Sequence, residues 1–120
     1  MLSSKKRAYY YGLFSEWAAC LFLMLKGYRF IKHNYLTKVG QVDLIFMKGE
    51  SLIFIEVRSR RNSKMIENLI SIKQKRHLIN TANYFLAKNK IFSNKIVRFD
   101  AIYIVGLFRV MHFKNIYDDL

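Results

Sequence analysis

The chain has 120 residues, of which 52% are hydrophobic, and its formal net charge at pH 7 is +13. This length and hydrophobic content predict one domain, residues 1–120, that buries a single core. The only cysteine, Cys20, excludes an intrachain disulfide and is typical of a cytoplasmic protein. The charge indicates a polyanionic partner, either nucleic acid or an anionic membrane. Compositional drift can explain part of the lysine excess, but it explains less well the four arginines that gather between Arg58 and Arg76.

The segment from Tyr9 to Lys26 contains no proline and predicts a helix that ends before Gly27. This segment is apolar on most sides, so we expect it to pack against a sheet. Its only acid, Glu16, must reach water, a basic partner or a metal ion. The apolar run from Trp17 to Leu25 is shorter than the roughly 20 residues that a membrane span requires, so we expect no stable membrane insertion.

Residues 28–35 predict a strand in which the apolar Tyr28 and Phe30, and Leu36 just after it, alternate with Arg29 and Lys32. His33 lies in this strand with no second histidine nearby, and we assign it no role. A turn is expected at residues 37–40.

The stretch from residue 40 to residue 58 predicts a β-hairpin folded over a Gly49-Glu50 turn, and counting outward from that turn places Asp43 opposite Glu56. Opposed residues have Cβ atoms about 4.5–5.5 Å apart, where like charges are destabilising. The two carboxylates therefore need a cation between them or a shared proton. Arg58 falls on the same face as Glu56, and such a trio can hold a divalent metal beside a phosphate. In the alternative, a slipped register leaves both acids at solvated strand ends.

A polar basic loop is expected after this hairpin, then a short helical turn at residues 65–70 and a helix from an N-cap at Ser71 to about Lys88. Cations in the first turns of a helix oppose its dipole, which favours a bound anion there. The candidate phosphate contacts from the loop and the helix are Arg58, Arg60, Arg61, Lys73, Lys75 and Arg76. The alternative is an ordinary solvated basic face.

The last third of the chain predicts a strand at Ile96–Val105, a turn at Gly106 and an antiparallel strand at residues 108–113. We expect Asp100 to form an ion pair with Arg98 or with a lysine of the second helix. Residues 118–120 are expected to be frayed.

The predicted order is therefore one helix, three strands, a second helix and two strands. In this order and with its motifs, the chain resembles the YraN-type uncharacterised bacterial family, whose members have a restriction-endonuclease-like fold. The motifs are Gly12 with Glu16, Gly27-Tyr28, Asn34, Gly40-Gln-Val-Asp-Leu-Ile45, Phe54-Ile-Glu-Val-Arg-Ser-Arg60 and Arg98-Phe-Asp100. The resemblance covers nearly the whole chain and implies a single nuclease-like α/β domain, with a central mixed sheet of about five strands flanked by helices.

The family pattern is similar to the nuclease motif Asp…(Asp/Glu)-x-Lys, which is also seen in archaeal Holliday-junction resolvases. By this likeness Asp43 and Glu56 would hold Mg²⁺, with Glu16 as a third acid from the first helix. A hard cation prefers such oxygen ligands, and one of its waters would attack the phosphodiester.

The chain departs from its family at three positions. Gln41 replaces an acid beside Asp43, Arg58 replaces the motif lysine, and Gln74 stands where the second helix of the family tends to carry lysine. Arginine binds phosphates but cannot act as a base, so it is not a conservative replacement for lysine. These changes preserve phosphate binding, with Gln74 added to its candidate contacts, and put hydrolysis in doubt.

Three hypotheses follow. The first is a metal-dependent nuclease-like protein that acts on structured DNA, and the second is a non-catalytic nucleic-acid-binding module. The third, a cationic protein at a membrane surface, is disfavoured by the facing acids and by the resemblance. Arg58 and Gln41 favour binding of nucleic acid, DNA rather than RNA, with at most a weak or degenerate Mg²⁺-dependent phosphodiesterase activity. The sequence does not decide whether the protein is an enzyme or which oligomer it forms.

Overall fold

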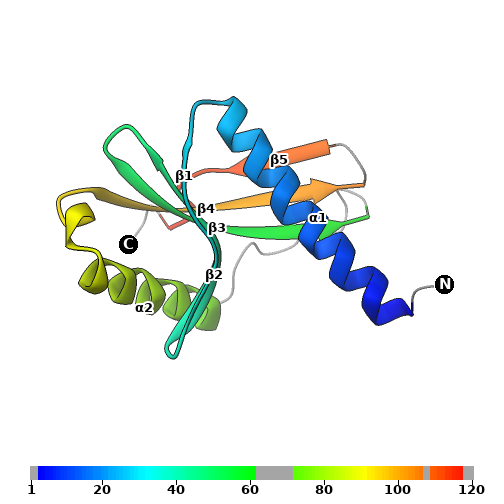
Figure 1. The fold of residues 1–120 in the computed structure, drawn as a ribbon, viewed down its shortest axis with the longest axis horizontal. Coiled ribbons are helices and arrows are strands. Elements are labelled where there is room, and N and C mark those ends of the chain that lie inside the picture. The colour runs from blue at the N-terminus through cyan, green and yellow to red at the C-terminus, as the bar shows by residue number, and fades with distance from the viewer. Residues whose placement is uncertain (1–2, 62–71, 107–108, 118–120) are drawn as a thin grey trace.

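The computed structural model describes residues 3–61, 72–106 and 109–117, and in these ranges the predicted order of helices and strands is confirmed (Figure 1). A short 3₁₀ helix, η2, is additional. The elements are α1 Ser4–Leu25, β1 Arg29–Thr37, β2 Gly40–Lys48, β3 Ser51–Arg60, α2 Ile72–Lys88, η2 Lys90–Phe92, β4 Ile96–Val105 and β5 Arg109–Phe113. The predictions for residues 65–70, for an N-cap at Ser71, for the start of the last strand at residue 108 and for the tail at 118–120 lie outside the described residues.

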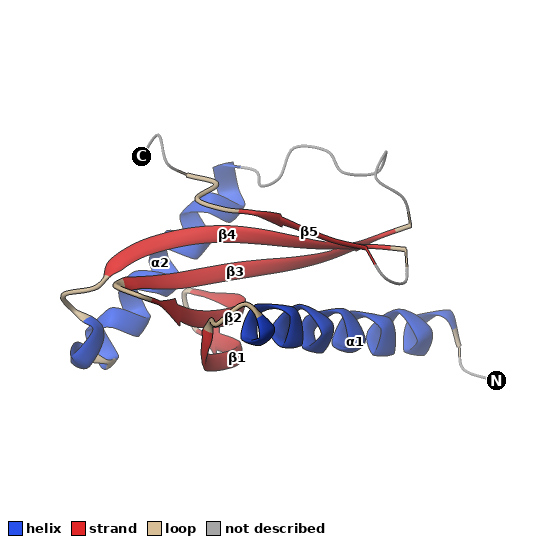
Figure 2. Cartoon of the chain, turned by 90° about the horizontal axis from the view of Figure 1, so that it is seen from above, coloured by secondary structure: helices blue, strands red, loops and turns tan. Residues whose placement is uncertain are grey.

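The five strands form one mixed sheet in the order β1-β2-β3-β4-β5, which confirms the expected α/β fold with a central mixed sheet of about five strands. Strands β3 and β4 are parallel, and the other neighbours are antiparallel. A parallel pair needs a crossover connection, and α2 lies in that connection. Figure 2 shows α1 and α2 on opposite sides of the sheet.

Successive side chains of β3 point to opposite faces of the sheet and pack into two separate hydrophobic layers. Ile53, Ile55 and Val57 pack in the cluster that α1 covers, whereas Leu52 and Phe54 pack in the cluster that α2 covers. Because side chains alternate along a strand, residues 56 and 58 fall on the α2 face of β3. The fold therefore directs the Glu-Val-Arg motif of β3 towards α2.

Helix α1 starts earlier than predicted, because the hydroxyl of Ser3 caps it by accepting from the backbone N–H of Lys6 at 3.2 Å. It ends where predicted, and Gly27 follows in the left-handed conformation with φ of 87°. Ala19 and Leu23 on its inner side are fully buried against the sheet, as expected for an apolar helix. Among the described residues, no helix is both long enough and apolar enough to cross a membrane.

The predicted apolar face of the first strand is confirmed for Tyr28, which is buried, and is wrong for the other two residues. Phe30 is 39% exposed and Leu36 is 64% exposed. The strand forms an edge of the sheet, and its pairing with β2 shifts between Phe30 and Lys32. Such a bulge moves the residues on either side of it to different faces.

The predicted basic loop also begins too early. Ser59 and Arg60 continue β3, because the parallel pairing with β4 extends as far as Arg60 opposite Val105. The two partners of this pairing are far apart in the sequence, so local periodicity after Arg58 does not reveal it.

Candidate functional site

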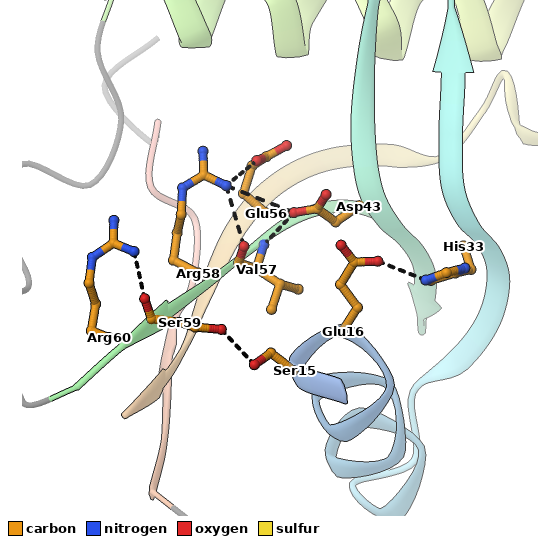
Figure 3. A network of polar contacts seen from close by, with 9 residues as sticks. All are labelled: Ser15, Glu16, His33, Asp43, Glu56, Val57, Arg58, Ser59 and Arg60. Atoms are coloured by element: carbon orange, nitrogen blue, oxygen red, sulfur yellow. Dashed lines mark hydrogen bonds and ion pairs between the residues drawn. The ribbon is translucent and has the colours of Figure 1, made fainter. Parts of the chain in front are cut away.

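Asp43 of β2 and Glu56 and Arg58 of β3 lie together at the centre of the candidate site (Figure 3). The Arg58 guanidinium donates from Nη1 to Oε2 of Glu56 at 2.9 Å, and the same Nη1 is 3.9 Å from Oδ2 of Asp43. The cation that two neighbouring acids require is therefore supplied by the chain itself.

The predicted hairpin register is confirmed from Lys48 opposite Ser51 to Leu44 opposite Ile55. Beyond that pair the strands are not joined by a further ladder pair, and the carboxylate of Asp43 accepts the backbone N–H of Val57 at 2.8 Å. The carboxylate of Asp43 therefore satisfies the backbone N–H of Val57 at the point where the pairing of β2 with β3 ends. The site lies where these two strands separate, and the slipped register is excluded.

Glu16 reaches the site from α1 and finds a basic partner rather than open solvent. Its Oε1 lies 2.8 Å from Nε2 of His33, and the two side chains are 22% and 17% exposed. The ring of His33 also stacks on Trp17, with a centroid distance of 4.3 Å. Sequence reasoning gave His33 no role, although counting back from the turn at residues 37–40 places it opposite Leu44, directly beside Asp43.

Burial dominates the electrostatics of the acid pair. It is the largest cause that raises the pKa of Glu56 to about 7, and the charge of Asp43 raises it further while Arg58 opposes both. Burial likewise raises the pKa of Asp43, helped by Glu16 and opposed by the N–H of Val57, by Arg58 and by His33. Glu16 is therefore close enough for its charge to act on both acids, while its role as a third metal-binding acid stays a prediction.

An open groove of about 540 Å³ leads to these acids. One wall is the β1–β2 turn, and the other is the first turns of α2. The lining residues are Leu36, Thr37, Lys38, Val39, Gly40, Gln41, Asp43, Glu56, Arg58, Gln74, His77 and Leu78. The groove thus brings Gln41 and Gln74, both predicted from the family pattern, to the same cavity as the acids.

The remaining candidate phosphate contacts are more dispersed. Arg60 lies over the ring of Tyr103 at 5.5 Å, and Lys75 lies over the ring of Tyr117 at 5.0 Å. Arg61 and Arg76 are exposed, and the side chain of Lys73 falls outside the described part of the chain. Arg58 alone of the predicted basic contacts lines the groove within the described residues.

A bound Mg²⁺ ion stays a prediction, and the present arrangement does not fit one. Within the described residues no group of three or more His, Cys, Asp or Glu side chains is placed to hold a metal ion. Arg58 lies between Asp43 and Glu56, and Glu16 is paired with His33. Mg²⁺ demands a nearly octahedral shell of oxygen atoms, which a guanidinium between the two acids prevents.

The mixed five-stranded sheet with helices on both faces defines an α/β protein of the nuclease-like fold. Within that class the chain belongs to Uncharacterised protein family UPF0102, the YraN family, whose model matches residues 15–104. The resemblance of the motifs is therefore confirmed.

Curated members of the family align over most of their length. A UPF0102 protein of Clostridioides difficile is 35% identical over 108 residues, which cover 87% of this chain and 93% of that protein. A UPF0102 protein of Ehrlichia ruminantium is 34% identical, with 90% of this chain and 84% of that protein covered. A third, from Mesorhizobium japonicum, is 30% identical, with 94% and 90% covered.

Proposed function

We propose that this protein binds nucleic acid through its phosphates at the groove between the β1–β2 turn and α2, with little or no hydrolysis. The observation that carries this proposal is the position of Arg58, which lies between two acids at the floor of an open groove. Two uncompensated carboxylates there would repel a phosphate. The guanidinium offsets this repulsion, and the rest of the chain contributes the net charge of +13 that attracts a polyanion.

The same arrangement argues for binding rather than cleavage. Arg58 remains charged at every physiological pH, so it can clamp a phosphate but cannot deprotonate a water molecule. Gln41 beside Asp43 accepts and donates hydrogen bonds without adding the negative charge that a metal ion needs. We place this function in the cytoplasm, where a single cysteine stays reduced, and we expect DNA to be preferred over RNA.

The test is fluorescence anisotropy of labelled duplex DNA, branched DNA and RNA, titrated with protein in EDTA over a range of NaCl concentrations. We expect binding without metal, with log K falling linearly against log salt at a slope of about −0.9 per phosphate neutralised. Arg61→Ala should weaken binding several-fold on every sequence. Lys88→Ala is the matched control, because it removes one exposed charge at the far end of α2.

Two outcomes would contradict the proposal. One is an affinity that does not change with salt concentration. The other is rapid cleavage in Mg²⁺ or Mn²⁺ that Asp43→Ala and Glu56→Ala abolish, since this would show an efficient nuclease.

A further inference from the structure

The outer side of α1 carries a row of large apolar side chains that the sheet does not cover. Phe14, Trp17, Leu21, Met24 and Leu25 are 53%, 52%, 58%, 51% and 79% exposed. From Phe14 to Met24 they follow one another at intervals of three or four residues, and Leu25 lies four residues after Leu21. This spacing places them on one face of the helix, and we call this set the outer stripe. Side chains of this size exposed together on a small protein indicate an interaction surface.

Basic residues stand at both ends of the outer stripe. Arg7, Phe14 and Leu21 are seven residues apart, about two helical turns, so Arg7 continues the line of the stripe towards the N-terminus. Lys26 and Arg29 are exposed just beyond its other end. The N-terminal end of α1 projects past the strands (Figures 1 and 2), and Arg7 in this part of the helix is exposed.

The charges argue against a second copy of this chain as the occupant. An antiparallel pair of α1 helices would set Arg7 of one copy near Lys26 of the other, and a parallel pair would set each basic end against itself. Glu16 is the only acid of α1, and it is bound to His33. Neither pairing brings an acid to these bases, so the occupant must itself carry negative charge.

The side chains of the stripe also argue against nucleic acid at this surface. Bases bind single-strand platforms by stacking on aromatic faces. Three of the five side chains, Leu21, Met24 and Leu25, have no aromatic face, and one face of Trp17 is covered by His33. Exposed tryptophan, phenylalanine and aliphatic side chains on one side of a helix, with basic residues at its ends, suit the interface of an anionic bilayer, where apolar groups enter and cations meet phosphates.

We propose that the outer stripe of α1 is a docking surface for an anionic phospholipid membrane, on which the helix lies flat without crossing the bilayer. Phe14, Leu21, Met24 and Leu25 enter the boundary between headgroups and acyl chains. Arg7, Lys26 and Arg29 contact the lipid phosphates. The groove that holds Arg58 is formed by other elements, so this attachment is independent of the proposed nucleic-acid function.

The test uses the full chain and phosphatidylcholine vesicles with or without phosphatidylglycerol. Trp17 is the only tryptophan, so its emission reports directly on the stripe. We expect a blue shift and co-flotation with vesicles that contain phosphatidylglycerol, and neither with phosphatidylcholine alone. Leu21→Glu should weaken the partition by about tenfold or more, because it removes apolar area and adds a repelled charge. Ile91→Glu is the matched control, since Ile91 is 80% exposed on η2, outside the stripe, and should bind vesicles as the wild type does.

Circular dichroism and thermal unfolding must first show that both variants are folded, and Phe14→Glu provides a second probe if Leu21→Glu is not. Three results would overturn the proposal. Vesicle binding that Leu21→Glu and Ile91→Glu weaken equally would show attraction by charge alone. A dimer in light scattering that Leu21→Glu dissociates would assign the stripe to a second copy. Loss of DNA binding rather than vesicle binding in Phe14→Glu would assign it to nucleic acid.

Discussion

Arg58 determines what the acid pair can do. A lysine at this position would offer a single flexible ammonium, whereas the planar guanidinium contacts Glu56 at 2.9 Å, lies 3.9 Å from Asp43 and donates to the carbonyl oxygen of Val57 at 3.3 Å. Because its charge lies between the acids, it competes with any divalent ion for the same carboxylate oxygens. The arginine at this position thus makes the two acids part of an internal ion pair.

Replacing Arg58 should reveal this competition. In Arg58→Gln we expect Mn²⁺ to bind at least about tenfold more tightly than in the wild type, since a positive charge within a few ångströms of the metal position is removed. Isothermal titration calorimetry above the raised pKa of Glu56 measures the change. Arg60→Gln alters the net charge equally, but Arg60 lies over Tyr103, so its Mn²⁺ affinity should stay near the wild-type value. Equal effects of the two substitutions would contradict the competition.

The raised pKa of Glu56 predicts a pH dependence of stability. Burial, and then the charge of Asp43, raises the pKa from 4.5 to about 7. The folded state therefore binds the proton more tightly than the unfolded chain. This contribution to the free energy of unfolding is fully present below pH 4.5 and is lost as the pH rises through about 7.

In Glu56→Gln the side chain stays neutral at every pH, so this variant does not lose stability as the pH rises through about 7. Its free energy of unfolding should rise relative to the wild type by about 1–3 kcal/mol between about pH 5 and pH 8. Urea unfolding at a series of pH values measures it, and the acidic end serves as an internal control because both side chains are neutral there. A constant difference between the two proteins at all pH values would refute the shift.

The residues whose positions the sequence predicted correctly are those fixed by a short turn. Asp43, Glu56 and Arg58 lie within ten residues of the Gly49-Glu50 turn, so counting from it placed them correctly. His33 belongs to a different strand, and its role depends on Glu16 of a helix seventeen residues away in the chain. Periodicity describes each element alone, so it does not show that this helix and this strand meet.

The β1–β2 turn packs closely on α2 at Gly40, and this contact sets the width of the groove. A Cβ atom at Gly40 would meet Oγ1 of Thr81 and would lie 2.9 Å from the carbonyl oxygen of His77. Thr81 is fully buried and donates to that same carbonyl at 2.7 Å, so it cannot easily rotate away. The absence of a side chain at Gly40 therefore lets the turn and the helix form adjoining walls of the groove.

Gly40→Ala should destabilise the protein by about 1–3 kcal/mol, because the added methyl group forces the turn away from α2. It should also weaken DNA binding, since the groove walls move apart. Gly12→Ala is the contrasting control, because nothing lies within 4 Å of a Cβ atom there and alanine suits a helix interior better than glycine. Denaturant unfolding compares the two variants, and a destabilisation of the same size in both would exclude the proposed clash.

At the level of elements, local pattern predicted the cores of helices and strands better than their ends. The strand predicted at Ile96–Val105 has those bounds in the structure, because it pairs with β3 along its whole length and is buried from Phe99 to Val105. In contrast, β3 continues to Arg60 only because β4 offers it a partner. The bulge of β1 after Phe30 likewise arises from pairing with β2, which hydrophobic alternation does not encode.

At the scale of the whole molecule, segments that are distant in the sequence are connected by hydrogen bonds around Asp100, whose carboxylate is fully buried. It accepts two hydrogen bonds from Arg98 of β4, at 2.9 and 2.8 Å, and one from His112 of β5 at 2.8 Å. The backbone N–H of Asn115 donates to it at 2.9 Å, and Arg98 also donates to the hydroxyl of Tyr28 at 3.2 Å, just before β1. The expected pair with Arg98 is confirmed, and the lysine of the second helix is not among these partners.

The overall architecture was predictable because the order of elements and the motifs together matched one family. Composition alone supported only a single basic domain. The connections of Asp100 were not predictable, since Tyr28, His112 and Asn115 lie at positions that no local pattern links. They join the residue before β1, the strands β4 and β5 and the segment after β5 around a single charge.

Asp100→Asn should therefore be one of the most destabilising conservative substitutions in this chain. The amide keeps the size of the side chain but leaves the guanidinium of Arg98 without its counter-ion, which costs about 3–5 kcal/mol at neutral pH. Burial alone would raise the pKa of Asp100, but the hydrogen bonds from His112, Arg98 and Asn115 outweigh it and hold the pKa below its ordinary value of 3.8. The contribution of the carboxylate is thus present above pH 3.8 and is lost as the pH falls through the lower, folded-state pKa.

The free-energy gap between wild type and Asp100→Asn should accordingly be largest near neutrality and should narrow in strong acid, where the wild-type carboxyl is itself protonated. Denaturant unfolding across this pH range measures the gap. Glu50→Gln provides the matched control, because Glu50 also forms an ion pair, with Lys95, but its side chain is 75% exposed and the pair is worth no more than about 1 kcal/mol. If the two substitutions cost the same, Asp100 is not the charge that holds these strands together.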